Sequence, residues 1–494
     1  MGKRQQLKRH FGWFSMLGVT CTLTCTWEAV PILLVEGLEN GGPGGLIYGF
    51  LYCWLGTMAI AASLGEMASM APTSGGQYHW VALLAPPKSS RFLSYFTGWL
   101  STLAWQAVLA SGGQLVGTII QGLVVLNHPT YDYHRWQGTL LFWAVILVAL
   151  FTNVFLASLL PKIEVVTLAI HLAGFLAILV PLVYLSTDHS SAAEVFTVFT
   201  DEGGWNSTGL SFSVGLTGTM CALVGADAAI HMAEEVQNAS TVIPWTMIGA
   251  IAINGTLGLA ITIAILFCMG NIADALASPT GFPFIEIFYS ATSSAGGATA
   301  MTSIITFLSV IATVNSLLSA SRQMWAFARD NALPFSHILC RIETRTQLPL
   351  YSLGLSVTIS YILALINIGS SVALNAIVSL VVAGLYTSYV VPITLILIKR
   401  VRGDPVRWGP WKMGRWGILV NITSIIYIIL AVFFSFFPPT AVVTPATMNW
   451  SILVYGVVVL FSVGFWFVHG HKVYNGPIME VTVEDVIGAS SGQT

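Results

Sequence analysis

Apolar segments of roughly 20 residues recur along the whole chain, and this pattern constrains the fold more than any other feature. The chain has 494 residues, of which 55% are hydrophobic and only 8% are charged. Soluble domains average about 25% charged residues, so this composition cannot supply a water-facing surface. Membrane strands alternate over about ten residues, and these segments are longer and uniformly apolar. The sequence therefore predicts an all-α integral membrane protein embedded in a lipid bilayer.

We expect twelve transmembrane helices in one transporter domain, residues 12–469, between cytoplasmic tails of residues 1–11 and 470–494. Basic residues concentrate on the cytoplasmic side of membrane proteins. With the N-terminus inside, 18 of the 19 Lys and Arg residues fall in cytoplasmic segments and only Arg135 falls outside. Both termini are therefore expected in the cytoplasm, and we expect the plasma membrane. The predicted spans are 12–36, 46–70, 92–125, 138–160, 164–185, 209–233, 243–269, 298–325, 350–367, 372–398, 417–437 and 451–469.

The spacing of these spans repeats along the chain. Residues 12–185 and 209–398 each hold five spans, at an offset of about 200 residues, and the last two spans lie outside the repeat. Because five is odd, the second unit enters the membrane from the opposite side. This is the five-plus-five inverted repeat of secondary transporters, whose site lies at the midplane between interrupted helices.

The first helix of each unit carries ionisable residues at membrane depth. Span 6 contains Gly225, Asp227 and His231, and span 1 contains Trp27 and Glu28. Such residues are costly in a bilayer and by default mark a functional site, while a helix break is tolerated only beside a cavity. The alternative is close helix packing through small residues with a hydrogen-bonded acid. We expect breaks at residues 26–29 and 223–227.

Residues at these breaks are the candidate substrate-binding residues. Glu28 and Trp27 suit an ammonium group through charge and cation–π contact, although a buried Trp is more often a packing residue. Asp227 either meets substrate or caps a half-helix. The predicted set is Thr26, Trp27, Glu28, Ala29, Val224, Gly225, Ala226 and Asp227.

Titratable groups within the spans suggest the coupling ion. The proton-coupling candidates are Glu28, His171 and His231, because a histidine titrates near neutral pH. Polar residues of span 8 leave sodium open as an alternative ion, namely Asn315, Ser316 and Ser319. At the cytoplasmic end of span 2, Glu66 is expected to pair with Arg322 or Arg329, as a gate or a structural ion pair.

Three motifs resemble the amino acid–polyamine–organocation superfamily, and the likeness extends over all twelve spans. Thr26-Trp-Glu-Ala29 is most similar to the fungal branch of amino acid, GABA and choline permeases. Many carriers of this superfamily have a glycine-rich first break that holds a substrate carboxylate, and this chain has none there. The motifs are Gly65-Glu-Met-Ala-Ser-Met-Ala-Pro-Thr-Ser-Gly-Gly76, Gly225-Ala-Asp-Ala-Ala-Ile-His-Met-Ala-Glu-Glu235 and Ser319-Ala-Ser-Arg-Gln-Met-Trp-Ala-Phe-Ala-Arg-Asp330.

The resemblance implies secondary active transport of an amino acid or related small amine, driven by protons, through alternating access. A choline or other quaternary-amine permease and a GABA permease are alternatives within the same scaffold. A nutrient sensor that binds substrate with little transport is an alternative of another class, although such sensors usually add a long soluble tail. The resemblance implies no enzyme activity.

Other signals narrow the function and give two further expectations. No phosphate-binding loop, catalytic triad, metal pattern or basic nucleic-acid tract stands out, so we expect no cofactor, metal or nucleic-acid partner. Segments 71–80 and 281–290 are expected to form interfacial helices or gates. Asn206 and Asn449 head glycosylation sequons in predicted external loops.

Overall fold

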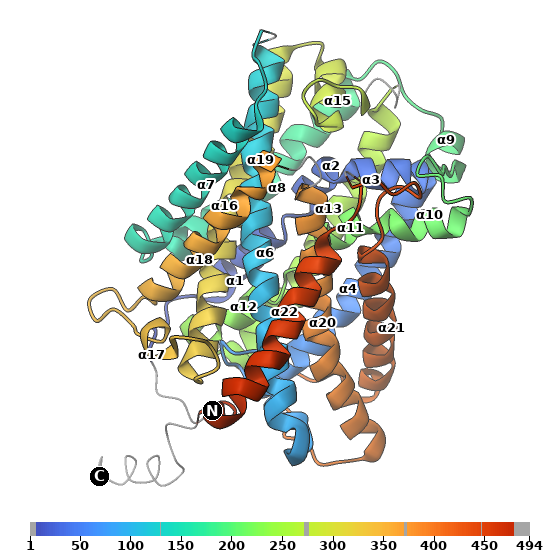
Figure 1. Cartoon of the computed structure of the whole chain (residues 1–494). Helices are drawn as coiled ribbons and strands as arrows, with labels where there is room; N and C mark the ends of the chain where they lie inside the picture. Colours follow the sequence, from blue (N-terminus) through green and yellow to red (C-terminus); the bar gives the residue numbers. More distant parts are fainter. Residues whose placement is uncertain (1–5, 129, 271–275, 370–372, 446, 479–494) are drawn as a thin grey trace.

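The protein is an all-α helical bundle in the computed structural model, which describes residues 6–128, 130–270, 276–369, 373–445 and 447–478 (Figure 1). Within these ranges the backbone forms helices and two isolated β-bridges, with no strand. Part of each predicted tail, residues 1–5 and 479–494, lies outside the described residues.

Eleven helical segments among the described residues are long and apolar enough to cross a membrane. They match predicted spans 2 to 12. Predicted span 4 extends too far, because its helix ends at Phe155 and the next begins at Leu160. The segments are α4 (Gly42–Met70), α6 (Pro87–Asn127), α7 (Arg135–Phe155), α8 (Leu160–Leu185), α10–α12 (Thr208–His231), α13 (Ala239–Cys268), α16 (Ala295–Arg329), α18–α19 (Leu350–Gly369), α20 (Ala373–Arg402), η2–α21 (Gly414–Ser435) and α22–α23 (Ser451–Val473).

The first predicted span is divided into three short helices, α1 (Trp13–Thr24), α2 (Thr26–Ile32) and α3 (Leu34–Glu39). Each is shorter than the roughly 20 residues that a membrane crossing needs. Together with the eleven continuous segments they make up the twelve spans that the sequence predicts.

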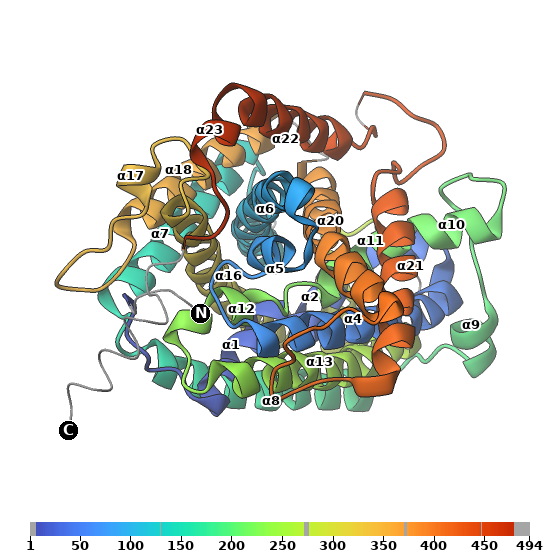
Figure 2. The same cartoon turned by 90° about the horizontal axis from the view of Figure 1, so that it is seen from below.

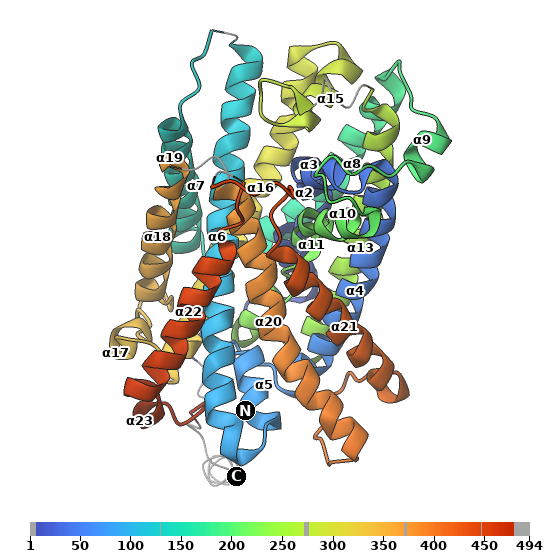
Figure 3. The ribbon, with the colours of Figure 1, turned by 45° about the vertical axis from the view of Figure 1, so that its right-hand side comes forward.

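Packing partners follow the inverted repeat. In the first unit α1 packs on α8, and the equivalent helices of the second unit, α11 (Leu216–Leu223) and α20, also pack together. The pairs α4 with α13 and α6 with α16 join equivalent helices of the two units. Short helices follow the second helix of each unit, as predicted: α5 (Gln77–Leu84) packs on α6 and α15 (Pro283–Thr292) on α16. Figure 3 shows α5 and α15 at opposite ends of the bundle.

Two backbone interruptions face the interior of the bundle. In span 1 the break is at Cys25, whose φ of 49° and ψ of 38° are left-handed, one residue before the predicted segment. In span 6 the backbone is non-helical from Val224, and Gly225 has a φ of 109° that only glycine adopts readily. A Cβ on Gly225 would lie 2.9 Å from Leu23 Cδ2, so the two breaks approach each other closely.

Short helices lie between the spans or form parts of them, and the burial pattern is that of a membrane protein. Large apolar side chains such as Phe155, Leu176, Val180 and Leu460 are exposed on the outside of the bundle, where lipid would cover them. Polar side chains are buried near α6, which other helices surround when the bundle is viewed end-on (Figure 2). The short elements are α9 (Ala192–Thr197), α10 (Thr208–Val214), α12 (Ala228–His231), η1 (Ala233–Glu235), α17 (Ser336–Leu339), η2 (Gly414–Trp416), η3 (Trp466–Gly470) and α23 (His471–Val473).

Candidate functional site

A cavity of about 90 Å³ lies between the two helix breaks. This is the volume of about three water molecules, so the site is narrow in this conformation. Its walls carry small hydroxyls, thiols and apolar groups but no charged side chain. The lining residues are Leu23, Thr24, Cys25, Ala29, Ile32, Leu33, Val108, Ser111, Gly112, Leu115, Cys221, Val224, Ser309, Ala312, Thr313, Ser316 and Val381.

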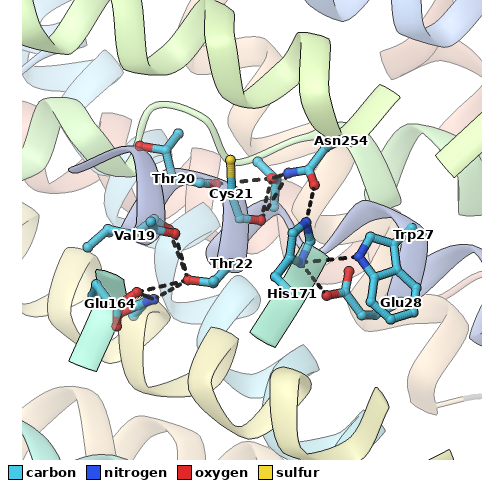
Figure 4. A network of polar contacts seen from close by, with 12 residues as sticks. Val19, Thr20, Cys21, Thr22, Trp27, Glu28, Glu164, His171 and Asn254 are labelled. Atoms are coloured by element: carbon cyan, nitrogen blue, oxygen red, sulfur yellow. Dashed lines mark hydrogen bonds and ion pairs between the residues drawn. The ribbon is translucent and has the colours of Figure 1, made fainter. Parts of the chain in front are cut away.

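Glu28 belongs to a polar network beside the first break, in which His171 contacts Glu28, Trp27 and Asn254 (Figure 4). Its side chain is fully buried, and its Oε1 lies 2.6 Å from His171 Nδ1. The Trp27 indole nitrogen lies 3.2 Å from the same Nδ1, and His171 Nε2 lies 2.9 Å from Asn254 Oδ1. Glu28 and His171, which the sequence analysis proposed separately, are therefore direct partners.

Hydrogen counting shows that this pair holds a shared proton. The Asn254 amide nitrogen donates to the carbonyl of Cys21, so Asn254 Oδ1 is an acceptor and His171 Nε2 must carry hydrogen. The 2.6 Å contact between Glu28 Oε1 and His171 Nδ1 then also needs a hydrogen, on one atom or the other. Because the Trp27 indole N–H donates to the same Nδ1, that nitrogen is an acceptor and the hydrogen lies on Glu28 Oε1. A neutral imidazole therefore faces a carboxylic acid, and the pair is neutral.

The second oxygen of Glu28 gives the network a link to the cavity. Oε2 is buried and has no hydrogen-bond partner among the described residues. The Cys25 thiol contacts both Glu28 and Ser309, and Cys25 and Ser309 are cavity-lining residues. The carboxylate is thus separated from the cavity by one side chain.

Asp227, at the other break, has a different environment. Its Oδ1 accepts a 2.6 Å hydrogen bond from the Tyr389 hydroxyl, and its Oδ2 accepts from Gln77 at 2.8 Å and from Trp105 at 3.3 Å. His231 Nε2 lies 3.4 Å from Oδ2, and its Nδ1 lies 2.9 Å from the Ser74 carbonyl. Both carboxylate oxygens are therefore occupied by donors from α5, α6 and α20.

The remaining predicted break residues face in several directions. Ala29 and Val224 line the cavity, whereas Thr26 faces α13, with its Cγ2 near Gly258. Trp27 packs edge-to-face on Phe175 of α8, with ring centroids 5.8 Å apart. Ala226 is buried beside Gly225. Cys25 lines the cavity but was not among the predicted site residues, because neither charge nor hydropathy distinguishes a thiol that faces a cavity.

A second buried acid, Glu164 on α8, was not among the predicted residues. Its Oε2 lies 3.0 Å from Thr22 Oγ1 and 3.1 Å from Asn315 Nδ2. The predicted span begins at residue 164, which places this acid at the membrane boundary and not one turn inside the helix. A signal was present, because Pro161 is a favoured first-turn residue and places the helix start one turn earlier.

The predicted gate pairing of Glu66 is wrong. Glu66 accepts two 2.6 Å contacts from Arg400 at the end of α20, and its Oε1 also accepts from the Met413 backbone nitrogen. Arg322 instead pairs with Glu235 at 2.8 Å. The pairing depends on how α20 and α21 cross α4, which span positions alone do not determine.

Arg322 and Arg329 tie the end of α16 to the segment after the second break. Arg329 makes a two-pronged contact with Glu234, at 2.9 and 2.7 Å, next to the pair of Arg322 with Glu235. The segment at Glu235 also binds the amino-terminal chain, because the His10 and Phe11 backbone nitrogens donate to its carbonyl. The two ion pairs therefore lie side by side at the end of the bundle that is predicted to face the cytoplasm.

The two predicted glycosylation asparagines differ in exposure. Asn206 is exposed at a left-handed turn. Asn449 is only 6% exposed, and its amide nitrogen contacts Ser379 and the carbonyls of Ser435 and Phe437. The folded chain therefore presents Asn206 and shields Asn449.

Comparisons with known proteins agree with this architecture. The amino acid permease family model matches residues 11–459. A protein of Macrophomina phaseolina described as an amino acid/polyamine transporter is 30% identical, over 88% of this chain and 96% of its own. The choline transporter of Saccharomyces cerevisiae is 31% identical, over 95% and 83%, and amino-acid permease 2 of Neurospora crassa is 28% identical, over 94% and 84%. The match covers both broken helices and nearly every span, so this chain belongs to the amino acid permease family.

Proposed function

We propose that this permease takes up a small amino acid or quaternary amine together with a proton, by alternating access around the two breaks. The observation that carries the proposal is the neutral, proton-sharing pair of Glu28 and His171 beside the first break. The relatives' names include amino acids and choline, and these substrates share an ammonium group. GABA, the other alternative, has the same group.

The chemistry of the pair explains why transport would need a proton. Without its proton the pair carries one negative charge in a site with no counter-cation, which is unfavourable in a low-dielectric interior. The carrier therefore switches between its two access states most readily when the pair of Glu28 and His171 holds its proton. An ammonium group of the substrate in the cavity would reach Glu28 Oε2 once the Cys25 side chain moves aside.

Asp227 is assigned a positioning role in this mechanism. Its three hydrogen bonds fasten the second break to α5, α6 and α20, and α5 follows the second helix of the first unit. His231, our other proton-coupling candidate, contacts the same carboxylate and the loop before α5. A shift of α5 during transport would be transmitted to the break through these contacts.

Sodium is the second candidate ion. Ser316 lines the cavity and the Ser319 hydroxyl is buried without a partner, but the Asn315 amide donates toward Glu164. An amide donor in that position is unsuited to a cation, so the geometry favours the proton.

An uptake screen in a permease-deficient host tests the proposal. Choline, GABA and the amino acids are supplied at external pH 5 and 7.5, with a protonophore and with sodium replaced by potassium. We expect faster uptake at pH 5 and loss of accumulation with the protonophore. Uptake that needs sodium and ignores pH would contradict the proposal. Substrate binding without accumulation at either pH would indicate the sensor alternative.

Localisation and topology belong to the same proposal. The distribution of basic residues supports the placement of both termini in the cytoplasm, and plasma-membrane placement is proposed together with uptake. An epitope tag after Thr494 should be reached by antibody only in permeabilised cells. Surface labelling of intact cells would contradict the orientation.

A further inference from the structure

Glu164 is a buried carboxyl group that the proposed mechanism has not used. It lies one turn inside α8, is fully buried, and faces α1 at the opposite end of the network from Glu28 (Figure 4). Its Oε2 contacts Thr22 and Asn315, whereas Oε1 has no hydrogen-bond partner among the described residues.

No cation compensates Glu164 in the part of the chain that the structure describes. On its own helix Lys162 is exposed to the outside and His171 pairs with Glu28. The ion pairs of α16 go to Glu234 and Glu235. A lone buried carboxylate is strongly unfavourable and normally takes up a proton instead. The charged or titratable residues on the helices packed against α8 are Cys21 of α1, Cys268 of α13, Glu286 and Tyr289 of α15, and Arg322 and Arg329 of α16.

The hydrogens around Glu164 also favour the protonated form. The Thr22 hydroxyl has one hydrogen, and its Oγ1 lies 2.9 Å from the Gly18 carbonyl, which can only accept. The Asn315 amide donates to both Thr22 Oγ1 and Glu164 Oε2. If Thr22 donates to Gly18, the 3.0 Å contact between Oγ1 and Oε2 has a hydrogen only when Glu164 supplies it.

We propose that Glu164 is a second proton-binding site, protonated while α1, α8 and α16 pack together and deprotonated when cytoplasmic water separates them. On opening, the carboxylic acid transfers its proton to water and leaves a hydrated carboxylate. The inference rests on the proposed proton coupling for its role in transport. The statement that Glu164 is a protonated carboxylic acid does not depend on transport and rests on its contacts alone.

The residues around Glu164 provide a path by which its proton can reach the cytoplasmic end of the protein. A cavity of about 430 Å³ at the cytoplasmic end is lined by Ser158 and Leu160, just before Glu164 on the chain, and by the ion pair of Glu235 with Arg322. Gly18 allows α1 to contact α8 here, because a Cβ on it would lie 2.5 Å from the Glu164 carbonyl oxygen. Opening the ion pair would therefore admit water to a tight helix contact.

The site suits a proton better than a metal ion. Among the described residues, two buried oxygens at this site have no hydrogen-bond partner, Glu164 Oε1 and Asn315 Oδ1, and a sodium ion would need several more. The Asn315 NH₂ group faces the carboxyl group, where it would repel a cation.

Infrared spectroscopy of the purified, lipid-reconstituted protein tests the protonation directly. The Glu164→Gln variant should lack one protonated-carboxyl C=O band that the wild type and the exposed-site control Glu202→Gln both show at pH 7. Identical spectra in all three proteins would overturn the inference. This result does not depend on transport, so it separates failure of the inference from failure of the proposed function.

Transport assays test the role of the site. With the substrate from the uptake screen, Glu164→Gln should keep exchange across vesicles within about threefold of wild type but lose at least tenfold in proton-driven accumulation. Asn315→Leu removes a donor that stabilises the carboxylate, so Glu164 should hold its proton to higher pH and the uptake profile should move to alkaline pH. Unchanged accumulation in Glu164→Gln, or an acidic shift in Asn315→Leu, would contradict the proposal.

Discussion

The two helix breaks each contain a buried acid, but the acids are in different states. Asp227 accepts three hydrogen bonds and uses both of its carboxylate oxygens. Glu28 uses one oxygen, on a histidine that can take up or release a proton, and leaves the other without a partner. The two acids occupy related positions in the two repeats but differ in role. Asp227 holds the backbone of the second break in place, whereas Glu28 remains available for chemistry.

The backbone conformations of the two breaks also differ, in a way that matches the difference between their acids. Gly225 adopts a conformation in which a side chain would be strained and would contact Leu23. Cys25 is left-handed as well, at a φ of 49°, yet it carries a side chain, and its thiol reaches Glu28 and Ser309. The second break is built for close backbone packing, whereas the first presents a side chain to the cavity.

The largest effect is expected from Glu28→Gln. The Gln amide cannot take up and release the proton of the Glu28–His171 pair, so proton-driven uptake should fall by roughly tens of fold or more. The variant should still fold, because a Gln amide can donate to His171 Nδ1. Initial uptake rates normalised to surface expression measure the effect, with Glu202→Gln as the matched exposed control. Wild-type kinetics in Glu28→Gln would place the site elsewhere.

Asp227→Asn should lower stability more than transport. Asn has one acceptor oxygen, so its NH₂ group would face the donors of Gln77 and Trp105 and leave them unsatisfied. We expect a loss of about 3 kcal/mol in unfolding free energy, seen as a lower melting temperature in detergent. The correctly folded fraction should keep its apparent KM within about threefold. A normal melting temperature with a large rise in KM would instead make Asp227 a substrate ligand.

Gly225→Ala tests whether the second break needs its backbone conformation. A side chain at this φ costs about 2 kcal/mol, and the added methyl group would contact Leu23. The melting temperature should fall, although by less than in Asp227→Asn. Gly249→Ala, on the ordinary helix α13, serves as the control, because its Cβ would meet only Leu17 at 3.6 Å. Equal stability of the two variants would show that the break is not strained.

The smallest effect is expected from Tyr389→Phe, which removes one of the three donors on Asp227 and preserves the ring. A hydrogen bond to a charged group contributes about 1.5 kcal/mol, and two donors remain. Thermal unfolding should show a modest decrease, with pH dependence of uptake unchanged. A change in the pH profile would indicate that Asp227 takes part in proton transfer.

Span positions and the existence of both breaks were predictable from sequence, because they follow from local costs. A bilayer requires long apolar helices, and an acid or imidazole within one must have a compensating environment. Glu28, Asp227, His171 and His231 were identified on this ground alone. The resemblance of the motifs to permeases supplied the expected transport function.

The pairing of these residues was not predictable, because it depends on helix rotation and crossing. Glu66 pairs with Arg400, more than 300 residues away in the chain, and not with Arg322. The same reason hid the contact of Glu28 with His171 and the fully bonded state of Asp227. The hydropathy of the sequence indicates how deep a residue lies in the membrane. Its hydrogen-bond or ion-pair partner depends on which face of its helix points toward the neighbouring helices.

Substrate-induced thermal stabilisation tests the contrast between the two acids most directly. A ligand that binds only the folded state raises its stability by RT ln(1 + [L]/Kd), so the shift in melting temperature reports binding separately from folding. Using the substrate from the uptake screen, we predict that Glu28→Gln has the melting temperature of wild type but loses the shift. Asp227→Asn should melt earlier and keep the shift. The reverse pattern, a stable Asp227→Asn that no longer responds and a destabilised Glu28→Gln that does, would contradict the account.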